Sequence, residues 1–209
     1  MTILKQLFKD NPPLQACKDE INKAFSLLHE TVAAGKCVYV CGNGGSAADC
    51  QHIVGEMMKG FNKKRPVDLP PEIVIKLSPE TAAHLAANLQ GAMPCHSLTV
   101  ETALITALCN DVSPDMIYAQ QVYGYCKVGD CLISISTSGN AANVCLAAEL
   151  ASAMGIKTIA MTGQSGGKLA GLCDVAIKAP SNATYKVQEY HLPIYHALCA
   201  ALEEVFYEN

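Results

Sequence analysis

The sequence lacks the features that mark several large classes of protein. No apolar run reaches the roughly 18 residues that a membrane-spanning helix needs, and residues 1–15 hold neither a continuous apolar segment nor a small-residue cleavage site. Only 16% of the residues are charged, and a net charge of -4 provides no basic field for a nucleic-acid backbone. We therefore expect a cytoplasmic protein that binds neither a membrane nor nucleic acid.

Two short motifs are also missing. No C-x-x-C pair occurs among the 11 cysteines, which argues against a structural cysteine–zinc site. The odd number of cysteines and their place in apolar stretches such as Cys37–Cys41 predict buried, reduced thiols. No G-x-x-x-x-G-K-[ST] occurs either, which excludes a P-loop nucleoside triphosphatase.

What the sequence does contain is a regular alternation of strand and helix patterns. Half of its 209 residues are hydrophobic, enough for a well-packed core. Strands are predicted at 37–41, 130–135, 157–161 and 174–178, and helices at 14–35, 47–58, 78–90, 102–108, 114–126 and 142–154. A long C-terminal helix follows, which Pro193 should kink or delay. The alternation predicts an α/β fold with a parallel sheet covered on both faces.

The pattern is interrupted between the first two strand-and-helix units. Residues 62–71 hold three prolines and the run Lys63-Lys64-Arg65, which we expect to be a solvated face. Ser78-Pro79-Glu80 then caps the next predicted helix. We therefore expect a helical insertion over about residues 62–94.

Three predicted strands end in loops rich in glycine, serine and threonine, at residues 42–46, 136–140 and 162–167. Ligands of open α/β sheets bind at the carboxyl ends of the strands, so the site should lie where these loops meet. Residues 136–140 offer hydroxyls and free amides at a helix N-terminus, which suit a phosphate. Capping of the helix by serine or asparagine is the alternative.

The first loop formally fits the G-x-G-x-x-A pattern of a dinucleotide site. About 20 residues later, where that pattern needs an acid, the chain has Lys63-Lys64-Arg65. The glycines therefore favour close approach to a small sugar-like ligand, and a structural tight turn is the alternative.

Four polar residues form a candidate metal site. His52 and Glu56 are four residues apart and share a helix face, a pair that suits a metal but is also common as a surface contact. Gln188 and His196 are eight residues apart, close to two helical turns. Two ligands from each helix would make a zinc or similar divalent site, although spacing cannot show that these helices pair.

The motifs occur in a fixed order along nearly the whole chain: Gly42–Asp49 with His52 and Glu56, Asn110-Asp111, Ser136–Asn140 with Asn143-Val144, Thr162-Gly163 with Gly166-Gly167, and Gln188-Glu189 with His196. Any one of them is a weak signal, and together they are specific. In this combination the chain closely resembles the phosphoheptose isomerases of the SIS sugar-isomerase superfamily.

The resemblance implies a single SIS domain over residues 1–209, with a flavodoxin-like five-stranded parallel sheet. It also implies a homotetramer with residues 1–35 in the interface, and zinc-dependent conversion of sedoheptulose 7-phosphate to a D-glycero-D-manno-heptose 7-phosphate type product through a cis-enediol. The metal ligands would be His52, Glu56, Gln188 and His196. The substrate contacts would be Asn43, Gly44, Gly45, Ser46, Asn110, Asp111, Ser136, Thr137, Ser138 and Gln188, the three hydroxyl residues taking the phosphate.

The proton-transfer pair is expected to be Glu56 and His196, because the chemistry needs a base and an acid on opposite sides of a two-carbon unit. The chain departs from the family pattern at Ala141, where a further serine is common, and at Tyr185, where an acid is common. Its stretch from about residue 65 to 94 is also longer than in the best-known members of the family. The rival functions are a non-catalytic SIS regulator resembling the DnaA-binding initiator-associating proteins, and a sugar-phosphate sensor. The complete metal set favours the enzyme.

Overall fold

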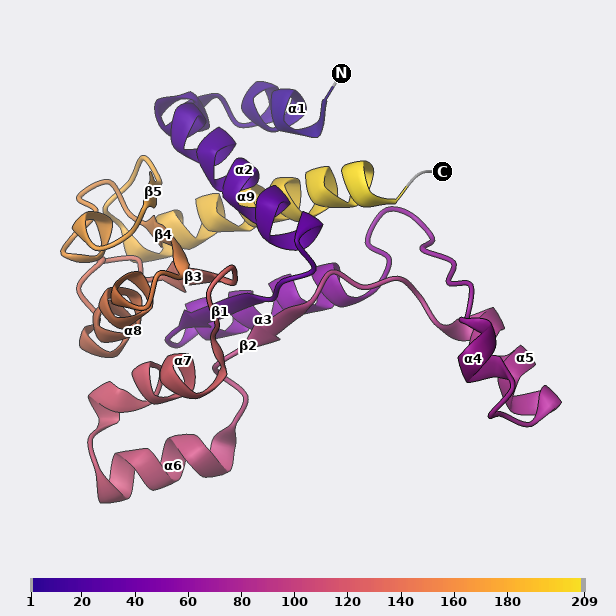
Figure 1. Cartoon of the computed structure of the whole chain (residues 1–209). Helices are drawn as coiled ribbons and strands as arrows, with labels where there is room; N and C mark the ends of the chain where they lie inside the picture. The colour runs from indigo at the N-terminus through magenta and orange to yellow at the C-terminus, as the bar shows by residue number, and fades with distance from the viewer. Residues whose placement is uncertain (1, 208–209) are drawn as a thin grey trace.

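A five-stranded parallel sheet lies at the centre of the computed structural model, which describes residues 2–207 (Figure 1). The strand order is β2-β1-β3-β4-β5, with β1 (Val38–Gly42), β2 (Cys95–Ser97), β3 (Cys131–Ile135), β4 (Lys157–Thr162) and β5 (Val175–Lys178). Val38 of β1 lies opposite both Cys95 of β2 and Cys131 of β3, and each neighbouring pair of strands is parallel. The predicted α/β class and the five-stranded parallel sheet are confirmed.

Helices cover both faces of this sheet (Figure 1). One face carries α1 (Ile3–Asp10), α2 (Lys18–Ala33), α3 (Gly45–Met58) and α9 (Thr184–Phe206), and the other carries α7 (Ala119–Tyr125), α8 (Ala142–Ala153) and, further out, α6 (Thr102–Asp111). Side chains alternate along β3, so that Ile133 and Ile135 join the first core and Leu132 the second. All five residues of β3 are buried, as a strand covered on both sides requires.

Several boundaries differ from the sequence prediction. The helix expected from residue 14 begins at Lys18, because the 3-10 helix η1 (Pro12–Cys17), with two prolines, precedes it. The helix expected at 114–126 is divided into η2 (Pro114–Met116) and α7, and η3 (Leu169–Gly171) follows β4. Helix α9 runs from Thr184 through Pro193, so the delayed start is wrong and a kink stays a prediction. Within residues 2–207 no helix is both long and apolar enough for a membrane span.

The chain between α3 and β2 forms an extension with two helices, α4 (Pro71–Val74) and α5 (Pro79–Asn88), which stand away from the sheet (Figure 1). Ser78 caps α5 by accepting a hydrogen bond from the amide of Thr81. Both helices fall within the described residues, and neither has a buried residue. The extension is anchored at its base, where the amide of Gly91 donates to the carbonyl of Arg65 at 2.8 Å.

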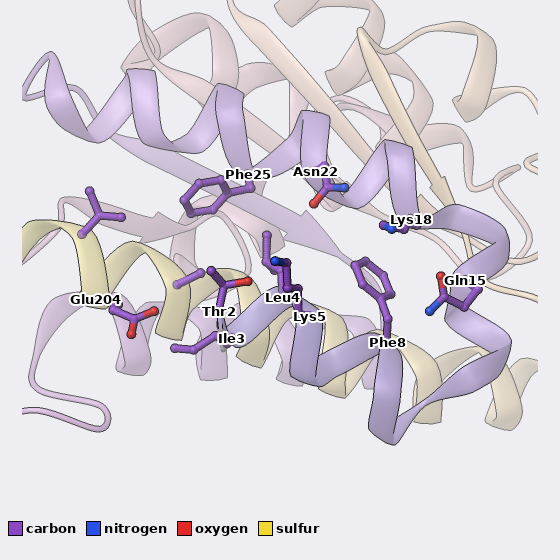
Figure 2. A pocket seen from close by; sticks show the side chains of 12 residues that line it. Thr2, Ile3, Leu4, Lys5, Phe8, Gln15, Lys18, Asn22, Phe25 and Glu204 are labelled. Atoms are coloured by element: carbon purple, nitrogen blue, oxygen red, sulfur yellow. The ribbon is translucent and has the colours of Figure 1, made fainter.

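Helix α1 packs against α9, and a groove of about 550 Å³ lies between α1, α2 and α9 (Figure 2). Its walls combine the rings of Phe8 and Phe25 with the charged side chains of Lys5, Lys18 and Glu204. The groove lies at the C-terminal end of α9, whereas the other end of that helix meets the glycine-rich loops. It is therefore separate from the predicted ligand site.

An ion pair between Arg65 and Glu203 lies inside the protein, with 2.8 Å between Nε and Oε1. Their side chains are 0% and 1% exposed, so the expectation of a solvated Lys63-Lys64-Arg65 run is wrong for Arg65. The guanidinium also donates to two carbonyls in the last turn of α3, at 2.9 and 2.7 Å. Glu203 accepts the amides of residues 61–63. The pair thus satisfies backbone groups where α3 ends, which offsets the cost of burying two charges.

Replacing Glu203→Gln should lower the free energy of unfolding by about 3–5 kcal/mol at pH 7, because Arg65 would stay buried without its counter-charge. Burial raises the pKa of Glu203, but the amides of Phe61 and Asn62 and the Arg65 guanidinium outweigh it and hold that pKa below its usual value. The stabilisation is therefore complete above the unfolded-state pKa of about 4.3 and is lost as pH falls through the folded-state pKa.

Urea unfolding at several pH values measures this loss. Glu204→Gln is the matched control, because the neighbouring Glu204 is exposed and its replacement should change stability by less than about 0.5 kcal/mol. Equal unfolding midpoints for the two variants at pH 7 would contradict the role given to the ion pair.

Candidate functional site

The carboxyl ends of β1, β3 and β4 bring three loops together. The amide of Gly163 donates to the carbonyl of Thr137 at 3.0 Å and joins the second loop to the third. The first loop is joined to α8 by mutual side-chain hydrogen bonds between Asn43 and Asn143, at 2.9 and 3.1 Å. The loops therefore meet at one edge of the sheet, as the parallel strand order requires.

The loop of residues 136–140 connects β3 to α8. Its hydroxyl residues differ in exposure, being buried at Ser136, half-buried at Thr137 and exposed at Ser138. The N-cap residue of α8 is Ala141, which has no side-chain oxygen, so capping by Ser138 or Asn140 does not explain the loop. Asn140 instead donates to the carbonyl of Ser138 at 3.0 Å and accepts from the amide of Lys168 at 3.1 Å. The helix start therefore remains available to an anion.

The first loop presents Asn43, Gly44 and Gly45 to solvent, while Ser46 is buried at the start of α3. Gly44 has a φ of +56°, a left-handed conformation that favours glycine. Sequence reasoning missed Tyr118, whose hydroxyl donates to the carbonyl of Gly42 at 2.5 Å and also contacts Oδ1 of Asn43 at 3.1 Å. This tyrosine holds the loop from the opposite face of the sheet.

Two predicted sugar contacts lie apart from these loops. Asn110 and Asp111 are exposed at the end of α6, and the side-chain amide of Asn110 donates to Oδ1 of Asp111 at 2.7 Å. Among the described residues, no hydrogen bond connects either side chain to the glycine-rich loops. Within one chain, no described hydrogen bond therefore connects these residues with the site.

Helices α3 and α9 pack together and bring His52, Glu56 and His196 into contact. Nε2 of His52 lies 3.1 Å from Oε1 of Glu56 and 3.5 Å from Nε2 of His196. The pairing of the two helices, which spacing alone could not show, is thus present. Burial, together with the neighbouring His52, lowers the pKa of His196 and favours its neutral form at pH 7.

No group of three or more His, Cys, Asp or Glu side chains in residues 2–207 is arranged to hold a metal ion as it stands. His52, Glu56 and His196 come near to such a group. In a tetrahedral site with ligands about 2.0–2.1 Å from zinc, neighbouring ligand atoms are about 3.4 Å apart. The two separations from Nε2 of His52, 3.1 Å to Glu56 and 3.5 Å to His196, match that spacing. Oε2 of Glu56 is also buried without a hydrogen-bond partner, so the donor set fits a cation.

The fourth predicted ligand, Gln188, has no hydrogen bond to the other three among the described residues. Its side-chain amide packs against Gly45, where it occupies the space that a Cβ atom would need. Gln188 is two helical turns before His196 on α9, so it meets the first turn of α3 rather than the turns that carry His52 and Glu56. The structure thus places Gln188 beside the first glycine-rich loop.

A cavity of about 330 Å³ opens beside His196. It is lined by α1, by Phe61 and Asn62 after α3, and by α9. Helix α1 contributes the side chains of Gln6, Asp10 and Asn11, which offer the donors and acceptors that a polyhydroxylated ligand needs. The sequence predicts residues 1–35 to be an N-terminal helix in the oligomer interface, and it assigns these polar residues no role in the site.

Comparison with known proteins gives a consistent result. SIS domain families match residues 73–202 and 13–86. The chain is 34% identical to a phosphoheptose isomerase from Akkermansia muciniphila, over 93% of this chain and 89% of that protein, and 38% identical to one from Nitratiruptor sp., over 85% and 81%. Among solved structures, phosphoheptose isomerase GmhA from Neisseria gonorrhoeae superposes with a TM-score of 0.72 at 29% identity, covering 95% of this chain and 93% of that one.

Gly139 in the second loop should not tolerate a side chain. Its φ is +66°, and a Cβ atom there would overlap the backbone of Gly166 and Gly167 in the third loop. Gly139→Ala should therefore lower the free energy of unfolding by more than about 1 kcal/mol. Gly124→Ala is the control, because a Cβ atom at Gly124 in α7 meets nothing within 4 Å. The control should be neutral or stabilise by up to about 1 kcal/mol. A Gly139→Ala protein as stable as wild type in urea would refute this packing.

Proposed function

The chain belongs to the phosphoheptose isomerases of the SIS domain family, and from this premise we propose that it converts sedoheptulose 7-phosphate to a D-glycero-D-manno-heptose 7-phosphate type product. The observation that supports this most directly is the contact of His52, Glu56 and His196 between α3 and α9. A regulator or a sensor transfers no proton and needs no carboxylate set against two imidazoles. The cluster therefore favours the enzyme over those alternatives.

The proposed reaction moves a hydrogen between adjacent carbons of an open-chain sugar phosphate. A base removes a proton from C1 of the ketose and leaves the cis-enediol in its singly deprotonated form. A proton is then added at C2, while a hydroxyl proton passes from O1 to O2. Oxidation of C1 balances reduction of C2, so no external redox partner is needed. The protein has to supply proton-transfer groups on either side of the two-carbon unit.

We assign these two roles to Glu56 and His196. Oε1 of Glu56 faces His52, whereas its Oε2 has no partner and is free to take the proton from C1. His196 extends from the facing helix, and its lowered pKa leaves it unprotonated at pH 7, able to accept a proton from one oxygen and pass it to the other. The cavity beside His196 would let the sugar approach this histidine.

The proposal includes zinc, or another divalent metal, at about one ion per subunit. His52, Glu56, Gln188 and His196 would hold it. When bound, the metal would polarise the substrate carbonyl and make the neighbouring C–H more acidic. Three of the four donors are already in contact, which is the support for this assignment.

The phosphate is proposed to bind at Ser136, Thr137 and Ser138, where the start of α8 lacks a side-chain cap. The sugar hydroxyls are proposed to bind Asn43, Gly44, Gly45, Ser46 and Gln188, which lie together around the first loop. Asn110 and Asp111 complete the proposed contacts and would have to approach from elsewhere, because no described hydrogen bond ties them to that loop.

A single SIS domain over residues 1–209, a homotetramer with residues 1–35 in its interface, and a cytoplasmic location belong to the same proposal. The groove beside α1 and the two exposed helices of the extension support an assembly of subunits (Figures 1 and 2). On the extension, Ile73, Ile75 and Leu89 are 45%, 80% and 44% exposed. Burial of such side chains against another subunit would be favourable.

The direct test of the function is an assay of purified, zinc-loaded protein against a panel of ketose and aldose phosphates of five, six and seven carbons, followed by NMR. Sedoheptulose 7-phosphate should be converted most efficiently, with solvent hydrogen appearing at the carbon that gains a proton. Absence of turnover on every sugar phosphate, with zinc bound, would refute the proposal.

Replacing Glu56→Gln should reduce turnover by about a hundredfold or more, because the amide keeps the shape of the side chain but cannot act as a base. Zinc content should fall only modestly, since one oxygen donor remains. Glu149→Gln, at an exposed position on α8, serves as the control and should retain full activity. Full turnover of Glu56→Gln with saturating zinc would remove Glu56 from proton transfer.

Ser138→Asp should weaken sugar-phosphate binding by at least about tenfold, because a carboxylate would face the phosphate. Ser152→Asp, at an exposed position near the opposite end of α8, controls for the added charge and should bind as wild type does. Calorimetric titration with the substrate at constant salt gives both affinities. Equal affinities would place the phosphate away from residues 136–138.

A further inference from the structure

The side chains of Asp49 and Tyr195 extend the proposed metal cluster on the side of His52 that faces away from Glu56. Tyr195 on α9 is 2% exposed, and its hydroxyl lies 3.2 Å from Oδ1 of Asp49 and 3.0 Å from Nδ1 of His52. Asp49 and His52 are three residues apart on α3 and share one face of that helix. A single phenol from α9 therefore bridges two side chains of the facing helix.

The number of available protons fixes the direction of these hydrogen bonds. A phenol has one proton to donate, and a carboxylate can only accept. The hydroxyl of Tyr195 therefore donates to Asp49 and accepts from Nδ1–H of His52. A neutral imidazole with its proton on Nδ1 has a lone pair on Nε2. That nitrogen faces both Oε1 of Glu56 and Nε2 of His196.

We propose that Tyr195 is a positioning residue that holds His52, through Asp49, in the tautomer whose Nε2 is free to bind a metal. This inference rests on the proposed function, since it needs the metal site. Metal-ligating histidines generally use their second ring nitrogen in this way, and the group that holds it sets both the tautomer and the ring orientation.

The alternative tautomer explains why the hydroxyl matters. Without it, the proton of His52 is free to move to Nε2 and to be donated to Oε1 of Glu56, which is only 3.1 Å away. That hydrogen bond would occupy a donor atom of each residue and would compete with the metal. Packing alone does not prevent the exchange, because the rings of Tyr195 and His196 both meet the His52 ring edge-on whichever nitrogen carries the proton.

Tyr195→Phe removes the hydroxyl and leaves the ring. Zinc titration of the metal-stripped, full-length protein against a competing chelator should show affinity lowered by about 10–100-fold, the usual effect of losing such a partner. Tyr190→Phe is the matched control, because Tyr190 is a partly buried tyrosine of the same helix that packs against the core. Its zinc affinity should equal that of wild type. With saturating zinc, Tyr195→Phe should keep a kcat within about tenfold of wild type.

A second measurement observes the tautomer of His52 directly. Nitrogen-15 NMR of histidine in the metal-free wild type should show His52 protonated at Nδ1, and Tyr195→Phe should shift the proton towards Nε2. A wild-type His52 protonated at Nε2, or a Tyr195→Phe protein with unchanged zinc affinity, would overturn the proposal. A wild type that binds zinc tightly but isomerises no sugar phosphate would refute the proposed function alone, and a weaker zinc affinity of Tyr195→Phe would still support the role of Tyr195.

Discussion

The buried ion pair between Arg65 and Glu203 fixes the spacing of the two helices on which the candidate site is built. Arg65 follows α3 and binds carbonyls in its last turn, one of them the carbonyl of Glu56 itself. Glu203 lies on α9, seven residues and about two turns after His196, and therefore on the same face. The ion pair and the proposed metal ligands thus lie along a single seam between the helices. Any change in that seam would alter the distances within the site.

An ion pair this deeply buried is expensive unless its remaining donors and acceptors are used. Here Glu203 accepts three backbone amides, and Arg65 donates to carbonyls that the end of a helix would otherwise leave unpaired. A pair of apolar residues would fill the same space but could not terminate α3 or shape the turn after it. The ion pair therefore determines where α3 ends and how the following turn runs. Because Arg65 binds the carbonyl of Glu56, it also fixes the position of that site residue.

Sequence reasoning succeeded where the signal is local. The buried run of β3 and the glycine-rich loop before α3 can each be recognised from a few consecutive residues. Such strand, loop and helix patterns are enough to predict a parallel sheet. Sequence reasoning failed where the secondary structure or burial of a residue depends on a partner far away in the sequence. The three residues of β2 form a strand because they pair with β1. Arg65 is buried because it pairs with Glu203, which is 138 residues away in the sequence. For the same reason spacing proposed Gln188 as a ligand but could not show that its amide packs on Gly45.

Buried polar atoms without hydrogen-bond partners show where the fixed spacing of α3 and α9 matters. Buried side-chain atoms without a partner, among the residues that the structure describes, are Oδ2 of Asp49, Oε2 of Glu56, Oε1 of Gln121 and Nδ1 of His191. Three of the four belong to α3 and α9. Each such atom lowers stability by about 1–3 kcal/mol and would normally be removed by a small shift of the helices. The ion pair at one end of the seam, and Tyr195 between Asp49 and His52, oppose that shift. The fold therefore keeps polar atoms unpaired where a ligand can use them, and the stability comes from contacts that lie outside the site.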